Sequence, residues 1–170
     1  MVPRWILERE GISPNNRNLQ GLVDFTLAWG YVESKVMAHR RQGDSLNCVI
    51  FSQVIPKGEQ FIDDVMIDNA YAAYRARYNH GHGFENRMRG LHLAKRFRNE
   101  VIKTFRDPNP SSQLRARAVG FIVCRLRNNL FHGTKSLHDI LAQQDLLAVS
   151  AVGLQGLLVG LEPRLNPAEG

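Results

Sequence analysis

The sequence has only two cysteines, Cys48 and Cys124, and neither belongs to a Cys-x-x-Cys pair. A fold held together by several disulfides is therefore excluded, and the spacing gives no sign of a zinc site. The N-terminus also lacks the apolar core of a signal peptide, because charged residues interrupt it from Arg4 onward. We expect a cytoplasmic protein whose thiols are reduced.

Long uninterrupted apolar runs are also missing. The least polar stretch, Leu146 to Leu161, contains Gln155 and three glycines and is shorter than the roughly 20 residues that span a bilayer. We expect a buried helix here and no membrane partner. Gly156 and Gly160 lie four residues apart in this stretch and would allow a close helix crossing, either within the chain or between two copies.

Residues arranged as metal or cofactor ligands are not evident. His80 and His82 lie in a glycine-rich loop, and no Cys or acidic residue accompanies them at a metal-ligand spacing. Gly81 and Gly83 are not followed by the Gly-Lys-Ser/Thr of a phosphate-binding loop. We therefore expect neither a metal nor a cofactor.

Apolar residues are abundant and recur at helical spacing. They make up 44% of the 170 residues, enough for one sizeable core. Helices are expected over residues 18–41, 59–78, 84–105, 113–131 and 137–161. The short apolar run 46–54 could be a strand or a helix by periodicity, and a helix is favoured because no partner strand is evident. Strand-like alternation is absent, so the sequence predicts an all-α, single-domain antiparallel helical bundle of about five or six helices. This domain would span residues 1–170, with residues 1–17 as a polar leader.

Basic residues are concentrated in the middle of the chain. The formal net charge is +6, and the segment from Arg75 to Arg127 holds 11 arginines and 2 lysines against three acidic residues, a net +10. Arginine suits phosphate recognition because its guanidinium donates two parallel hydrogen bonds. A solvated helix face would show the same charge run.

Polar residues crowd the end of one expected helix, from Arg125 through Arg127, Asn128 and His132 to Lys135. Such a group can cleave RNA without a metal. Histidine can take the proton of the ribose 2′-hydroxyl and protonate the leaving 5′-oxygen, while arginine stabilises the charged phosphorane. A histidine that only caps a helix terminus would explain part of the pattern.

The string Arg127-Asn128-Asn129-Leu130-Phe131-His132 resembles the R-x4-6-H signature of HEPN ribonucleases, and its continuation to Lys135 is similar to variants found in bacterial toxin and phage-defence proteins. The resemblance implies a helical bundle and a homodimer whose two motifs share one cleft. It also implies an RNA endonuclease that leaves 2′,3′-cyclic phosphate and 5′-hydroxyl ends.

The spacing leaves the choice of arginine open. At 100° per residue, Arg127 points about 140° away from His132 on a straight helix, whereas Arg125 lies within about 20° of it. Arg125, Asn128 and His132 therefore share a face. The Arg-Asn dipeptide nevertheless favours Arg127, whose long side chain can reach His132 if the helix bends near Asn129. We expect Arg127, His132, Asn128 and Arg125 to form the catalytic group.

Further basic residues are candidates for RNA contacts. We expect Lys135, Arg87, Lys95 and Arg98 to contact the RNA backbone. The predicted function is a toxin or antiviral-defence endonuclease, and the alternative is a non-catalytic HEPN module that binds RNA, a nucleotide or a protein partner. Some toxin relatives place a tyrosine two residues after the motif histidine, where a partner enzyme modifies it. Thr134 occupies that position, so an antitoxin protein would have to act by another route.

Overall fold

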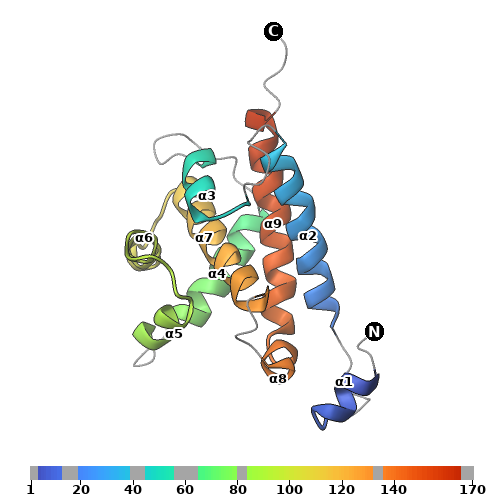
Figure 1. Ribbon diagram of the computed structural model, residues 1–170. Helices are drawn as coiled ribbons and strands as arrows, with labels where there is room; N and C mark the ends of the chain where they lie inside the picture. The colour runs from blue at the N-terminus through green and yellow to red at the C-terminus, as the bar shows by residue number, and fades with distance from the viewer. Residues whose placement is uncertain are drawn as a thin grey trace.

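Helices account for nearly all of the computed structural model, which describes residues 4–12, 19–38, 45–55, 65–79, 84–131 and 136–165 (Figure 1). The long helices are α2 (Gln20–Met37), α4 (Val65–Tyr78), α6 (Lys95–Arg106), α7 (Ser112–Phe131) and α9 (Gln144–Leu165). The short ones are α1 (Arg4–Arg9), α3 (Cys48–Val54), α5 (Phe84–Gly90) and α8 (Leu137–Leu141). No strand occurs within these ranges. The prediction of an all-α, single-domain bundle is confirmed.

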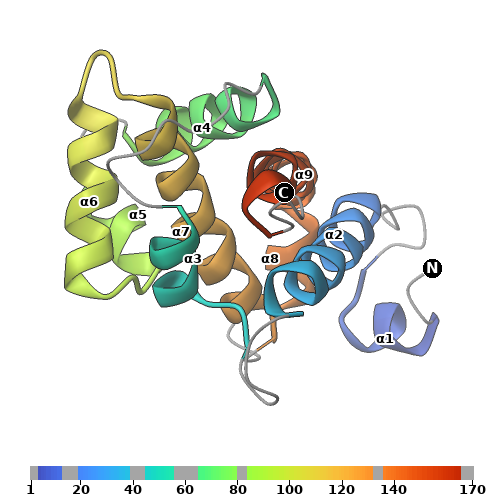
Figure 2. The same ribbon diagram turned by 90° about the horizontal axis from the view of Figure 1, so that it is seen from above.

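Helix α9 lies at the centre of the bundle, where it packs against α2, α4 and α7 (Figure 2). Its glycines permit a close approach to α4: a Cβ on Gly156 would lie 3.0 Å from the Met66 Cβ and 3.2 Å from the Ile67 backbone nitrogen. The buried hydroxyl of Tyr74 donates a 2.6 Å hydrogen bond to Ser150. The helix crossing expected at Gly156 therefore forms within the chain.

The prediction of an antiparallel bundle holds for α4 and α9 but is wrong for α2 and α9, which run side by side in the same direction (Figure 1). Their first turns meet, because Leu22 N–H donates a hydrogen bond to Gln144 Oε1 at 3.2 Å. Gly21 lies against the Gln144 carbonyl so closely that a Cβ would be 2.2 Å from its oxygen. The helices that lie between α2 and α9 in the sequence bring the chain back to the end of the bundle where α2 begins, and α9 starts from that end.

The helix predicted over residues 84–105 is interrupted between α5 and α6. Leu91 and Leu93 are both buried, and a continuous helix would point them about 200° apart. His92 between them has a φ of +52°, a left-handed conformation that turns the chain. The turn at His92 thus allows both leucines to be buried. The helical periodicity of residues 84–105 did not predict this turn.

The last predicted helix, residues 137–161, is also divided. Ser136 caps α8 as its sequence suggests: its hydroxyl accepts from the Asp139 backbone N–H at 3.2 Å, and the Asp139 carboxylate accepts from the Ser136 N–H. The chain then turns at residues 142–143 and begins α9 at Gln144.

The expected polar leader contains α1, and Ile6 of α1 packs against the buried Ile12.

The apolar stretch of α9 is longer than the stretch from Leu146 to Leu161 identified in the sequence. By length and composition, its Gln144–Leu161 stretch is apolar enough to cross a membrane, with a mean hydropathy of 1.5. Of this stretch, 56% is buried inside the fold, and the core helices of soluble proteins meet the same criteria. The expectation of a buried helix is confirmed by Leu147, Leu154 and Leu161, which are all fully or almost fully buried.

Candidate active site at the end of helix α7

The last turns of α7 lie between α2 on one side and the α5–α6 turn on the other. Helix α7 is fully buried along its middle, from Ala116 to Cys124, because the core packs around it. From Arg125 onward polar side chains alternate with apolar ones, and burial becomes partial. The motif therefore lies at the edge of the core, where α7 changes from a buried to a half-exposed helix.

Arg127 faces α2. Its guanidinium carbon lies 5.7 Å from the centre of the Trp29 ring, a cation–π contact. Its Nη1 also donates a hydrogen bond to Asn128 Oδ1 at 3.3 Å. The side chains of Arg127 and Asn128, both predicted for the site from the Arg-Asn dipeptide, therefore contact each other directly.

Trp29 is itself held in place by Glu33, one turn along α2. The indole Nε1–H donates to Glu33 Oε2 at 3.0 Å, and Glu33 Oε1 accepts from the Leu46 backbone N–H at 2.8 Å. These two residues were not identified from the sequence. A buried tryptophan followed by an acidic residue four positions later is a weak signal, because it does not indicate what the ring faces.

Arg125 faces the opposite side of α7. Its Nε donates a 2.9 Å hydrogen bond to the Leu91 carbonyl, and Asn129 Nδ2 donates to the Gly90 carbonyl at 3.4 Å. Both carbonyls lie at the C-terminal end of α5, where a helix leaves acceptors without partners of its own. Arg125 and Asn129 thus hold the α5–α6 turn, and the two candidate arginines point to different sides of the helix.

The remaining predicted site residues are only partly placed. His132 and Lys135 lie outside the described residues, as do His80 and His82. Within the described ranges, no three His, Cys, Asp or Glu side chains are grouped as metal ligands.

Arg87, predicted to contact RNA, lines a small cavity of about 200 Å³ beside the motif. Asn129 of α7 and Arg77 of α4 line the same cavity, so the fold brings these three residues together. Tyr78 also borders it, and burial raises the pKa of this tyrosine, which keeps its hydroxyl protonated. The cavity therefore combines two cations with neutral hydrogen-bonding groups, a lining suited to an anion.

Lys95 and Arg98, the other predicted RNA contacts, lie in the first turn of α6. Lys95 is exposed, whereas Arg98 is half-buried. Three neighbouring polar residues on α6 were not predicted: Arg96, Asn99 and Lys103 are all exposed. Their spacing of three and four residues puts them on one helix face, which is a signal that the sequence does contain.

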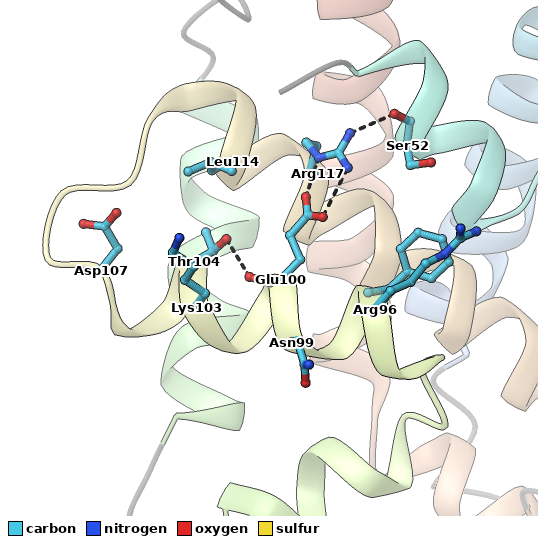
Figure 3. A pocket seen from close by; sticks show the side chains of 10 residues that line it. Ser52, Arg96, Asn99, Glu100, Lys103, Thr104, Asp107, Leu114 and Arg117 are labelled. Carbon is cyan, nitrogen blue, oxygen red and sulfur yellow. Dashed lines mark hydrogen bonds and ion pairs between the residues drawn. The ribbon is translucent and has the colours of Figure 1, made fainter. Parts of the chain in front are cut away.

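Arg96, Asn99 and Lys103 border a cavity of about 570 Å³ between α3, α6 and α7 (Figure 3). At its inner wall, Arg117 forms an ion pair with Glu100 through Nε, with Nη2 3.2 Å from Glu100 Oε2. Arg117 is only 4% exposed. Because this pair neutralises itself, the charge that a ligand meets is set by two cations, Arg96 and Lys103, against one carboxylate, Asp107.

Arg117 also connects α7 to the end of α3. Its Nη1 donates to the Ser52 carbonyl at 2.9 Å and to the Ile55 carbonyl. A single buried guanidinium therefore satisfies acceptors from two other elements of the fold. An arginine within the otherwise apolar run of residues 116–124 was the available sequence signal for this role.

The chain has no match among models of known protein families, among curated proteins or among solved structures. The resemblance to HEPN ribonucleases rests on the motif, of which the structure describes Arg127 to Phe131.

Proposed function

We propose that the chain is a metal-independent RNA endonuclease of the HEPN type, acting on single-stranded or loop RNA. The observation that carries the proposal is the contact between Arg127 and Asn128 at the end of α7, a few residues before His132 in the sequence. Toxin or antiviral-defence activity, and control by an antitoxin protein, remain predictions from the motif.

In the proposed reaction, His132 removes the proton of the ribose 2′-hydroxyl, whose oxygen attacks the adjacent phosphorus. The phosphorus–5′-oxygen bond breaks, and a protonated histidine, from the same or the second copy, donates a proton to the leaving oxygen. Arg127 stabilises the additional negative charge on the phosphorane. The products carry a 2′,3′-cyclic phosphate and a 5′-hydroxyl.

The contact of Arg127 with Trp29 supports this role over a purely structural one. This contact restricts the guanidinium without neutralising it, because the ring carries no net charge. By contrast, Arg125 directs its Nε to a backbone carbonyl. We therefore assign Arg127 to phosphate stabilisation and Arg125 to support of the α5–α6 turn.

The proposal includes RNA contacts on α5 and α6. Arg87 lines the cavity beside Asn129, and Lys95 begins α6 a few residues after Leu91, to which Arg125 is bonded. Arg96 and Lys103 continue the basic surface along α6. Charge of this kind attracts the phosphate backbone of any RNA sequence, so base preference would have to arise elsewhere.

A composite site requires two copies of the chain. Exposed apolar side chains on α2 and α9, including Leu27, Tyr31 and Val152, offer a surface for such a contact. The groove between these helices is lined by Ala28, Tyr31 and Val152 among others. We propose a homodimer that uses this face.

The test incubates the full chain with labelled single-stranded RNA in EDTA. We expect cleavage that produces 5′-hydroxyl ends, and its loss in His132→Ala and Arg127→Ala. RNA with 2′-O-methyl groups should bind but stay intact, because the attacking hydroxyl is blocked. His138→Ala, which removes an exposed histidine from α8, is the matched control and should cleave normally.

Two results would decide against the enzyme. Cleavage retained in His132→Ala would indicate a contaminating nuclease or a different site. RNA binding without cleavage would instead favour the non-catalytic HEPN module, which agrees with the structural use of Arg125 and Asn129.

A further inference from the structure

The two cysteines of the chain, 76 positions apart in sequence, lie together between α3 and α7. Cys48 begins α3, and its thiol donates to the Phe121 carbonyl on α7, with 3.7 Å between sulfur and oxygen. Cys124 follows Phe121 by about one helical turn on the same helix, and each thiol shifts the pKa of the other. The packing of α3 on α7 has thus brought the two thiols within reach of each other.

The two thiols differ in exposure and charge environment. Cys48 is half-buried, whereas Cys124 is almost completely buried. The hydrogen bond from Cys124 lowers the pKa of Cys48 below its usual value, and the positive charges of Arg125 and Arg96 contribute in the same direction. Burial raises the pKa of Cys124. Cys48 is therefore the reactive sulfur, and Cys124 remains a thiol beside it.

We propose that Cys48 and Cys124 form a modification site, a thiol pair that peroxide oxidises to an internal disulfide between α3 and α7. The proposal does not depend on RNA cleavage. Its basis is the position of the half-buried Cys48 thiol, which lies against the Phe121 carbonyl about one helical turn before the buried Cys124, the only other cysteine in the sequence.

The reaction proceeds in two balanced steps with hydrogen peroxide as the oxidant. The Cys48 thiolate attacks one peroxide oxygen, the O–O bond breaks, and hydroxide leaves and takes a proton from solvent to become water. The resulting sulfenic acid is attacked by the Cys124 sulfur, which forms the S–S bond and releases a second water. Two thiols lose two electrons and two hydrogens, and peroxide is reduced to two waters.

The position of the pair gives the oxidation a structural consequence. Cys124 directly precedes Arg125, which supports the α5–α6 turn through the Leu91 carbonyl. A disulfide would join α3 covalently to this part of α7, next to the proposed active site.

The experiment treats the native full chain with hydrogen peroxide, quenches it by acid, and maps non-reduced peptides by mass spectrometry. We expect the Cys48 and Cys124 peptides to be linked within one chain, with loss of two hydrogens and full reversal by dithiothreitol. Cys124→Ser should stop at the Cys48 sulfenic acid, which dimedone captures. Cys48→Ser should retain a free Cys124 thiol after the same treatment.

Other outcomes would overturn the proposal. These are a wild-type chain with both thiols still free, a Cys48 sulfinic acid with Cys124 unlinked, or disulfides that form only between chains. Because the wild-type peptide map decides between these outcomes, a misfolded variant would leave the test intact. None of these readouts depends on nuclease activity.

Discussion

The Arg127 guanidinium rests over the ring of Trp29, with 5.7 Å between the guanidinium carbon and the ring centre. The indole N–H of Trp29 is in turn bonded to Glu33 at 3.0 Å. The arginine of the proposed active site is thus positioned by a helix near the other end of the chain. This contact distinguishes it from Arg125, which bonds to the α5–α6 turn.

The two arginines should therefore respond differently to mutation. We expect Arg127→Ala to lower the RNA cleavage rate by about 10²- to 10³-fold, the usual effect of removing one donor to a developing oxyanion. Loss of the contact with the Trp29 ring should lower the free energy of unfolding by about 0.5–2 kcal/mol, which leaves the protein folded. Cleavage rates measured under single-turnover conditions test this, and a fully active Arg127→Ala protein would contradict the assignment.

Arg125→Ala should act mainly on stability. It removes the donor to the Leu91 carbonyl, and leaving an acceptor unsatisfied in a partly buried position costs about 1–3 kcal/mol. We expect this loss in the free energy of unfolding measured with urea. If Arg125→Ala instead abolishes cleavage at unchanged stability, the roles of the two arginines are reversed.

The buried pair of Arg117 and Glu100 should be sensitive to single substitution. Arg117→Met leaves the Glu100 carboxylate without this partner, and we expect a loss of about 3–5 kcal/mol in unfolding free energy. Glu100→Leu combined with Arg117→Met should recover part of the loss, because no unpaired charge remains. A double variant less stable than Arg117→Met would disprove this explanation.

The matched control for this pair is Asp68→Asn, which removes the charge facing Arg115 of the same helix and leaves the Arg115 hydrogen bond to the Pro110 carbonyl in place. Asp68 is half exposed, with a side chain that is 50% accessible. Exposed pairs contribute about 1 kcal/mol or less, so we expect a correspondingly small change in urea denaturation.

Cations at the rim of the α3–α6–α7 cavity should contribute to RNA affinity through charge. For the double variant Arg96→Ala/Lys103→Ala, the slope of log affinity against log salt concentration should fall by about 1.4, since each phosphate contact on single-stranded RNA contributes about 0.7. Fluorescence anisotropy at several salt concentrations measures this slope. Arg9→Ala/Lys35→Ala removes two cations from α1 and α2 and should leave the slope unchanged.

Dimer formation should depend on the exposed face of α2 and α9. Leu27 is 68% exposed, so Leu27→Glu should alter the stability of the fold by about 0.5 kcal/mol or less. We expect it to convert the dimer to monomer in sedimentation experiments. Val65→Glu, at an equally exposed apolar position on α4, should remain dimeric. A wild-type monomer at all concentrations would contradict the proposed homodimer.

The spacing of apolar residues along the sequence was sufficient to predict most helices. Residues 113–131 were expected to form a helix, and α7 spans Ser112–Phe131. This succeeded because Val119, Ile122, Leu126 and Leu130 recur at helical spacing, although the middle of the helix is buried on every side. The polar group at the end of α7 was visible for the same reason, although His132 and Lys135 lie outside the described residues.

Contacts between distant residues depended on tertiary packing. The turn at His92 arises where Leu91 and Leu93 are both buried and where Arg125 and Asn129 supply donors from another helix. Nothing within residues 84–105 specifies those partners. The shared direction of α2 and α9 depends in the same way on connections that helical periodicity does not describe.

The sequence by itself determined the all-α class, the basic character of the middle segment and the residues of the motif, because these follow from composition and local spacing. Tertiary structure decided that Arg127 meets Trp29, that Arg125 meets Leu91, and that Cys48 meets Cys124. The physical reason is that side-chain contacts depend on how helices pack around a common core, and each partner here comes from a different helix or turn.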